Sequence, residues 1–449
     1  MSEAPPRDDT LRTTPSFMDG VFMVAGAIPD ALLLYRGSSC IEEAFRAQMI
    51  DHDLRQTLTR PDAPNRLWVT RDPYTQMVMG TESEVMSTAD GAFARIAPSL
   101  VLLSELPRYL LAGEDLRAVA RALQKRHGVP VLAARTRHLD RSYEDAWEVL
   151  LAELAGACAE APAVEPDTLG LLGYLAHRSE GDVEGDLLEL ARLAGLLGLE
   201  LLPPWLSGAP WPELQRVAAC EQLIALPGAR KAAQRLRRAS ETAALELPLP
   251  LSLEGSSAWL QALGEARGRG PHLAELIGRE QERILERLET VADRLLGRRV
   301  MIAATREWLP GMVRCLTDDL GLEVDTAFCR SRGGPEGLPE QELVEARVER
   351  LLFDPSVERL QAAVEEAETR GPLDLLIGSA WEARAIAGRA PELPVLEFGY
   401  PQVDTHPLRP RPHLGFEGVL TLAERVLERL SASSAPRGRP RGGARRARS

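Results

Sequence analysis

The chain has 449 residues, of which 45% are hydrophobic and 27% are charged, so its composition is typical of packed domains and excludes global disorder. Its length predicts about three domains. No apolar run reaches the ~20 residues of a membrane span, and the first 20 residues hold no apolar signal core. Five cysteines are too few for a disulfide framework. We therefore expect a cytoplasmic protein with no membrane partner.

The first third of the chain alternates short apolar runs with helical patterns. Strands are expected at residues 31–35, 100–103 and 131–133. Each is followed by a loop and then by a helix, and the helices are expected near 41–49, 114–126 and 143–155. Apolar strands of four to six residues that alternate with helices are typical of parallel sheets covered on both faces.

An Ala-, Pro- and acid-rich stretch at 155–167 has no periodicity and predicts a linker. The strand–helix pattern restarts after it, with strands at 169–175, 199–202 and 221–226. A long amphipathic helix at about 273–296 is expected to connect domains. The pattern then restarts once more, with strands at 299–304, 322–327, 373–377 and 393–398 and a last helix at 415–430.

These elements predict an α/β protein of three Rossmann-like domains with parallel sheets. We expect a first domain at 1–165, a second at 166–297 that ends in the long helix, a third at 298–430, and a disordered basic tail at 431–449. The tail carries six arginines and no acid, whereas the whole chain has a formal net charge of −13. An acidic body disfavours nucleic acid as the main partner, although the tail could touch an anionic surface.

Ligands of open α/β sheets gather beyond the carboxyl ends of the strands, so the loop Arg36-Gly37-Ser38-Ser39-Cys40 is the first place to inspect. Cys40 is expected near the start of a helix, where backbone N–H groups favour a thiolate. It could be an iron ligand, a nucleophile, or a small buried cysteine at a strand–helix junction. Spacing alone favours the last of these.

Other site motifs are missing from the sequence. No cysteine pair has C-x-x-C spacing, no histidines form an H-x-x-x-H pair, and neither phosphate-binding glycine motif is present. His406 and His413 stand in a Pro-rich loop that we interpret as structural, and the turn at 378–381 does not fit a nucleophile elbow. If Cys40 binds an iron–sulfur cluster, the remaining ligands must therefore come from another chain.

Several segments, in order over about residues 17–430, resemble the component 1 family of nitrogenases and nitrogenase-like reductases. They are the segment from Gly26 to Cys40, the V-M-G-T-E-S-E-V element at 78–85, the region at 169–199 with its S-E-G-D turn, and two motifs near the end, F-G-Y-P-Q-V-D at 398–404 and P-H-L-G-F-E-G at 412–418. The last two are the most specific and are similar to the β-type subunits of that family.

The resemblance implies that Cys40 is the metal and cofactor ligand of this chain. The β-type subunits of nitrogenase hold their cluster with three cysteines, but here only Cys40 matches: the second would fall in the region of Arg66–Thr70, and the third where Ser104–Pro107 stands. One ligand from this chain and three from a partner would complete a [4Fe-4S] cluster at a subunit interface. Glu105 is a further, weaker oxygen-ligand candidate, and its alternative interpretation is a solvated loop acid.

We therefore expect the β-like subunit of a nitrogenase-like heterotetramer. It would pair with an α-like component 1 subunit and receive electrons from an ATP-dependent iron protein, through the shared [4Fe-4S] cluster, for a reducible substrate. One alternative is a non-catalytic scaffold for metal-cluster cofactor assembly. The other is a metal-free, glycosyltransferase-like or ligand-binding α/β protein.

Overall fold

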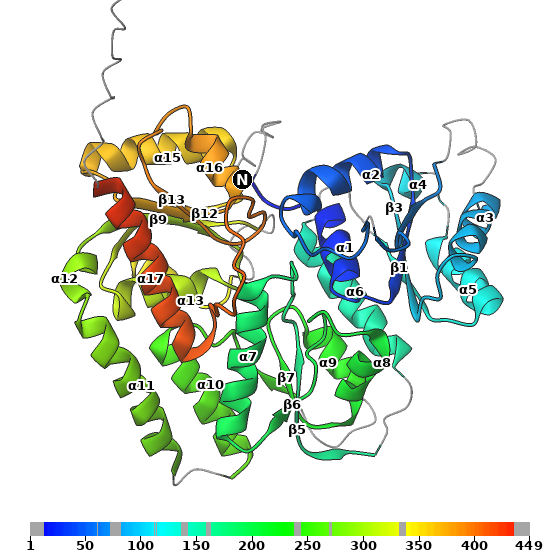
Figure 1. Cartoon of the computed structure of the whole chain (residues 1–449), viewed down its shortest axis with the longest axis horizontal. Helices are drawn as coiled ribbons and strands as arrows, with labels where there is room; N and C mark the ends of the chain where they lie inside the picture. The colour runs from blue at the N-terminus through cyan, green and yellow to red at the C-terminus, as the bar shows by residue number, and fades with distance from the viewer. Residues whose placement is uncertain are drawn as a thin grey trace, which may run out of the picture.

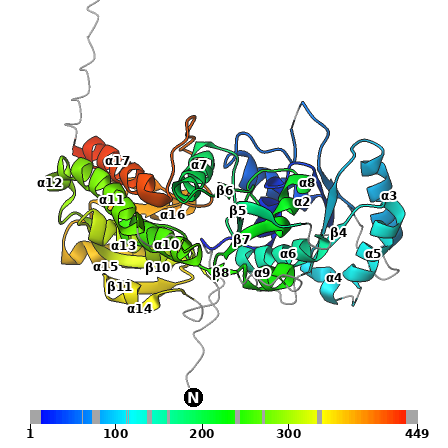
Figure 2. The same ribbon diagram turned by 90° about the horizontal axis from the view of Figure 1, so that it is seen from below.

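The computed structural model describes residues 13–60, 62–71, 82–111, 113, 115–135, 142–158, 163–237, 244–268, 272–331 and 338–434. Three separate parallel sheets, each with its own helices, form three lobes (Figures 1 and 2). The predicted class, α/β with parallel sheets, is confirmed. The domain boundaries stay a prediction, and residues 435–449 of the predicted tail lie outside the described residues.

The first sheet has the order β2-β1-β3-β4. Its strands are β1 (Ala31–Arg36), β2 (Leu67–Val69), β3 (Leu100–Glu105) and β4 (Val131–Ala134). Its helices are α1 (Phe17–Gly26), α2 (Cys40–Phe45), α3 (Glu82–Phe93), α4 (Pro107–Leu111), α5 (Leu116–His127) and α6 (Tyr143–Ala157). A π-helical segment, Arg46–Ile50, continues α2. Of the resembling element at 78–85, residues 78–81 lie outside the described part of the chain.

Continuous apolar runs form these strands because both faces of the sheet are buried. Leu33 of β1 packs into the core that includes α1 and α6, while Leu32 and Leu34 pack into a separate cluster with α3 and α5. Local signals then fix the helix ends. Asp115 caps the start of α5, and Gly128, with φ of 74°, ends it.

The second sheet has the order β6-β5-β7-β8. Its strands are β5 (Glu165–Leu172), β6 (Glu200–Leu201), β7 (Cys220–Ala225) and β8 (Leu245–Glu246). The helices of this region are α7 (Gly181–Leu196), α8 (Trp211–Leu214), α9 (Arg230–Leu236), α10 (Ser252–Ala266), α11 (Leu273–Glu289) and α12 (Ala292–Leu295). The predicted long helix is thus broken into α11 and α12. The first residues of the predicted linker belong to the end of α6, and its last residues belong to β5.

The third sheet has the order β11-β10-β9-β12-β13. Its strands are β9 (Arg299–Ala304), β10 (Glu323–Cys329), β11 (Val348–Phe353), β12 (Leu375–Gly378) and β13 (Val395–Glu397). Its helices are α13 (Leu309–Arg314), which continues as a π-helical turn to Asp319, α14 (Gln341–Glu345), α15 (Val357–Arg370), α16 (Ala380–Ile386) and α17 (Gly415–Ser434).

Helix α17, near the end of the described chain, packs against the second lobe. It packs against α7, α10 and α11 and is the red helix that runs beside α11 in Figure 1. It continues through Ser434, four residues into the segment predicted to be disordered. No helix in the described ranges is both long and apolar enough to cross a membrane.

Candidate functional site

The strand order places the Cys40 loop at the point where the first sheet reverses its winding. β2 and β3 flank β1 on opposite sides, so the loops after β1 and β3 diverge and leave room at the carboxyl edge, where ligands of such folds bind. The loop after β1 is Gly37–Ser39, and Cys40 is the first residue of α2.

Cys40 is exposed, so the expectation of a buried junction cysteine is wrong. Its Sγ lies 2.9 Å from Oγ of Ser38. The other four cysteines differ: Cys220, Cys315 and Cys329 are buried, and Cys158 is partly buried at the end of α6. Burial raises the pKa of the Cys158 thiol to about 12, which makes that group a poor thiolate.

The structure brings together the three segments that the family resemblance aligned with cysteine positions. The Gly37 amide donates to Oγ1 of Thr70 (3.1 Å), at the end of β2, and the Leu106 amide donates to the Arg36 carbonyl (3.0 Å). Thr70 and Leu106 therefore stand beside the Cys40 loop, but neither offers a metal ligand. In the part of the chain that is described, no group of three or more His, Cys, Asp or Glu side chains could hold a metal ion.

Glu105 is not the solvated loop acid that we considered. It is the last residue of β3, only 2% exposed, and its Oε2 accepts a hydrogen bond from Nη1 of Arg36 at 3.0 Å. The Arg36 guanidinium also lies over the Tyr109 ring, 4.5 Å from its centroid. This buried ion pair joins the last residues of β1 and β3, so it supports the base of the Cys40 loop.

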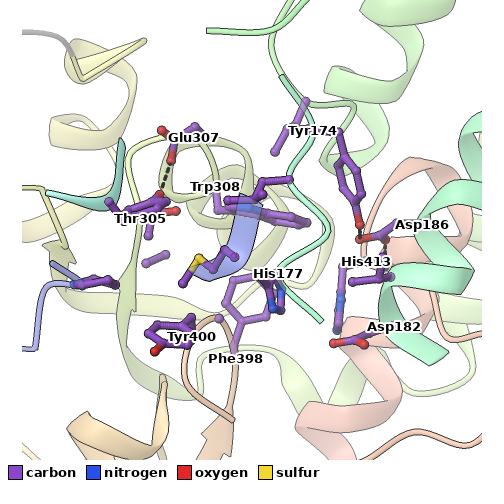
Figure 3. Close-up of a pocket in the computed structure, with 18 of the residues that line it drawn as sticks. Tyr174, His177, Asp182, Asp186, Thr305, Glu307, Trp308, Phe398, Tyr400 and His413 are labelled. Atoms are coloured by element: carbon purple, nitrogen blue, oxygen red, sulfur yellow. Dashed lines mark hydrogen bonds between the residues drawn. The ribbon is translucent and has the colours of Figure 1, made fainter. Parts of the chain in front are cut away.

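A second site, which the sequence analysis missed, is a cavity of about 70 Å³ where the three lobes meet (Figure 3). It lies beyond the carboxyl ends of β5, β9, β10 and β13, and α1 and α6 close it from the first lobe. Its polar lining includes His177, Asp182, Asp186, Glu307 and His413. Only the rule that strand ends gather ligands could have indicated it, because its residues come from distant parts of the sequence.

The cavity wall is aromatic. The Trp308 ring stands edge-on to the rings of Phe398 (centroids 5.4 Å apart) and His413 (6.4 Å), and Tyr174 and Tyr400 also line the cavity. Figure 3 shows Trp308 near the middle of the view, with Thr305 on one side of it and Tyr174 and His413 on the other. Such a wall suits a flat ligand.

The charged groups at the cavity already have partners. Asp182 accepts from Nε of Arg178 at 2.8 Å, and Glu307 accepts from the Tyr143 hydroxyl at 3.0 Å. Asp186 accepts from the backbone amide of His413 (2.6 Å), from that of Leu414 and from the Tyr174 hydroxyl. These bonds hold the backbone at His413, and Nδ1 of His406 lies 2.9 Å from Oε1 of Glu180. The structural role that the sequence indicated for both histidines stays a prediction.

A pH dependence follows from Asp186. Burial raises its pKa to about 7, against about 4 in an unfolded chain. Between these two pH values the folded state holds a proton that the unfolded state has lost, so this group lowers the stability as the pH rises from about 4 to about 7. Asp186→Asn removes the titration while keeping an acceptor oxygen. We expect the unfolding free energy of the variant, relative to that of wild type, to increase over that range by on the order of 2–4 kcal/mol. Denaturant titrations at pH 4.5, 6 and 7.5 measure this difference. A difference that does not change with pH would contradict this assignment.

Comparison with known proteins gives a consistent set of relatives. A family model described as nitrogenase component 1 type oxidoreductase matches residues 16–431. The chain is 25% identical, over 331 residues, to a nitrogenase molybdenum-iron protein alpha chain of Methanothermobacter thermautotrophicus; this match covers 70% of the chain and 64% of the relative, less than two thirds of its length.

Solved structures share the fold at low sequence identity. "Nitrogenase Cp1 at pH 6.5" superposes with a TM-score of 0.78 at 14% identity and covers 96% of this chain and 95% of that one. "Nitrogenase Cp1 at pH 5" gives a TM-score of 0.75 at 14% identity, with 96% and 90% covered. These structural matches extend over all three sheets of the chain.

Proposed function

The chain belongs to the nitrogenase component 1 type oxidoreductase family, and on this premise we propose that it is the β-like subunit of a nitrogenase-like reductase heterotetramer in the cytoplasm. Its partners would be an α-like component 1 subunit and an ATP-dependent iron protein. The observation that carries the proposal is the exposed Cys40 thiol at the winding reversal of the first sheet, beside two segments that lack cysteine.

The Cys40 thiolate can supply one of the four protein ligands of a [4Fe-4S] cluster, and the neighbouring segments supply none. Cys40 would supply one thiolate of a [4Fe-4S] cluster, and the partner would supply the other three. When bound, such a cluster would take up single electrons from the iron protein and release them to a reducible substrate. The curated relative is an alpha chain, so the β-like assignment rests on the single cysteine and on the F-G-Y-P-Q-V-D segment at 398–404.

The chain's own residues would hold the thiolate in place. Ser38 can donate its hydroxyl hydrogen to Sγ of Cys40, and hydrogen bonds to a ligating sulfur tune a cluster's potential. The hydrogen bonds that the Gly37 amide donates to Thr70 Oγ1 and that the Leu106 amide donates to the Arg36 carbonyl fix the loop, and the buried Arg36–Glu105 pair supports its base. This frame limits how far the sulfur can move when a partner approaches.

Anaerobic co-expression with an α-like partner tests the proposal. We expect the purified complex to contain iron and to give a [4Fe-4S] signal in electron paramagnetic resonance after reduction. Cys40→Ala should lose at least most of that signal and iron, because one of the four ligands is gone. Cys158→Ala, which removes a partly buried cysteine away from this loop, is the matched control and should keep both.

Two outcomes would decide against parts of the proposal. A cluster signal that is unchanged in Cys40→Ala would exclude the ligand role. A complex that holds the cluster but reduces no substrate when the iron protein, ATP and a reductant are added would favour the scaffold alternative.

A further inference from the structure

The contact between the first and third lobes includes a polar seam, which we define as Tyr143, Glu144, Arg306, Glu307 and Ser331. Tyr143 and Glu144 begin α6 of the first lobe, whereas the other three residues follow β9 and β10 of the third. The Tyr143 hydroxyl donates to Oε2 of Glu307 at 3.0 Å, and the Ser331 hydroxyl donates to Oε2 of Glu144 at 3.1 Å. Polar contacts between domains permit relative motion more readily than large apolar ones.

The segment before α1 bridges the same two lobes through its backbone. On the third lobe, the Thr13 amide donates to the Pro355 carbonyl at 3.4 Å, and Nε of Arg330 donates to the Thr13 carbonyl at 2.8 Å. On the first lobe, the Tyr143 amide donates to the Pro15 carbonyl at 3.2 Å. The lobes cannot separate without the loss of one of these two sets of bonds, so hydrogen exchange of the Thr13 and Tyr143 amides reports the opening of the seam.

The charges at the seam do not balance. The Arg306 guanidinium serves two carboxylates, because its Nε lies 3.3 Å from Oε1 of Glu144 and 3.4 Å from Oε1 of Glu307. Both acidic side chains are buried, at 4% and 9% exposed. Nη2 of Arg306 also lies 3.3 Å from Oε1 of Glu148, a partly exposed acid that meets Lys231 at the surface. One buried cation therefore faces two buried carboxylates, which leaves one negative charge in excess.

The described elements around Glu144 bring no further positive charge to it. The groups that surround it are hydroxyls, a thiol and carboxylates, from Ser142, Ser331, Tyr143, Cys329, Glu307 and Glu148. Residues 13–16 contain only Thr, Pro and Ser. Arg330, which follows β10, is engaged by Glu382 at 3.4 Å. The surplus negative charge is therefore not compensated by a second cation.

A surplus negative charge in a buried site is removed most simply by a proton. Burial, followed by the negative charge of Glu307, raises the pKa of Glu144 to about 8. When the lobes separate, water reaches this carboxyl and its pKa returns to about 4.3, the usual value of glutamate. Between these two pH values, separation therefore releases one proton, and the opening equilibrium constant rises by up to about 10-fold with each pH unit.

We propose that Glu144 makes the contact between the first and third lobes sensitive to pH: its proton holds the two lobes together, and the lobes separate with the release of that proton. The contact is tightest in acid and loosens as the pH rises. Separation would move the first sheet, with the Cys40 loop at its edge, away from the third sheet. The proposal does not rest on a cluster at Cys40, because no residue of that loop belongs to the seam.

Hydrogen exchange in the purified full chain tests the proposal. Overlapping peptides, analysed by mass spectrometry and corrected for the intrinsic exchange rate at each pH, give the opening constants at Thr13 and Tyr143. Glu144→Gln keeps the size of the side chain but cannot ionise. We expect the opening constant of wild type, relative to that of Glu144→Gln, to rise at least about 10-fold between about pH 5.5 and about pH 7.5. Asp186 is present in both proteins, so its own titration cancels in this ratio.

Glu153→Gln is the matched control. Glu153 lies on the same helix, α6, but it pairs with Arg117 at 3.2 Å, away from the seam. The opening constant of this variant should follow that of wild type at every pH. A ratio of wild type to Glu144→Gln that does not change with pH would overturn the proposal. A second outcome that overturns it needs no variant: if the Thr13 and Tyr143 amides of wild type exchange no faster than the amides of β1, the lobes have no opening of their own.

Discussion

Gly185→Ala is expected to cost about 3 kcal/mol or more of unfolding free energy, because the new methyl group has no space. A Cβ at Gly185 would stand 2.4 Å from the Pro412 nitrogen and 2.5 Å from the Arg411 nitrogen. Both are backbone atoms of the loop that leads to α17, so no side-chain rotation can relieve the contact. The loop would have to move away from α7, and His413, which follows it, would move as well.

The same helix supplies the control. Gly195 lies near the end of α7 and is exposed, and a Cβ there meets no atom within 4 Å. Gly195→Ala should therefore stabilise the protein slightly, by up to about 1 kcal/mol, because alanine is the better helix former. Urea titrations of both variants measure the difference. Equal stability of Gly185→Ala and wild type would contradict the close packing of α7 on this loop.

The second large effect is expected from Asp182→Asn, which should cost about 3 kcal/mol. Arg178 and Asp182 are 2% and 3% exposed, and Nε and Nη2 of Arg178 donate to the two carboxylate oxygens at 2.5–3.0 Å. Burial alone would raise the pKa of Asp182, but the adjacent Arg178 guanidinium lowers it below its usual value. The substitution leaves a buried guanidinium with Glu180, 3.5 Å away, as its remaining acidic partner.

The double variant Arg178→Met/Asp182→Leu tests whether the loss comes from the unpaired charge. Replacement of both charges by apolar groups should recover part of the stability that Asp182→Asn loses. The pair should also matter less in acid, because an acid whose folded pKa is lowered contributes stability above its unfolded pKa of about 4 and loses it as the pH falls further. Thermal unfolding at pH 7 and pH 3 measures both effects; a double variant less stable than the single one would contradict this account.

The sequence by itself determined the architecture. Runs such as Ala31–Tyr35 and Arg299–Ala304 are apolar on every residue or nearly so, and only strands buried on both faces need that pattern. It predicted most strands to within a few residues. It missed β2, β8 and β11, whose short or polar sequences carry little apolar signal and which form because a neighbouring strand offers hydrogen bonds.

The sequence also singled out Cys40, because a glycine-containing loop after a strand is visible without coordinates. Its exposure was not predictable, since the same pattern suits a buried cysteine, and the ion pair of Glu105 with Arg36 depends on the pairing of β1 with β3. Only the tertiary structure decided the cavity. His177 and His413 belong to different parts of the chain, and no local pattern specifies that both line one cavity. Strand formation follows local apolar periodicity, whereas the lining of a cavity is set by whichever groups the packed lobes bring together.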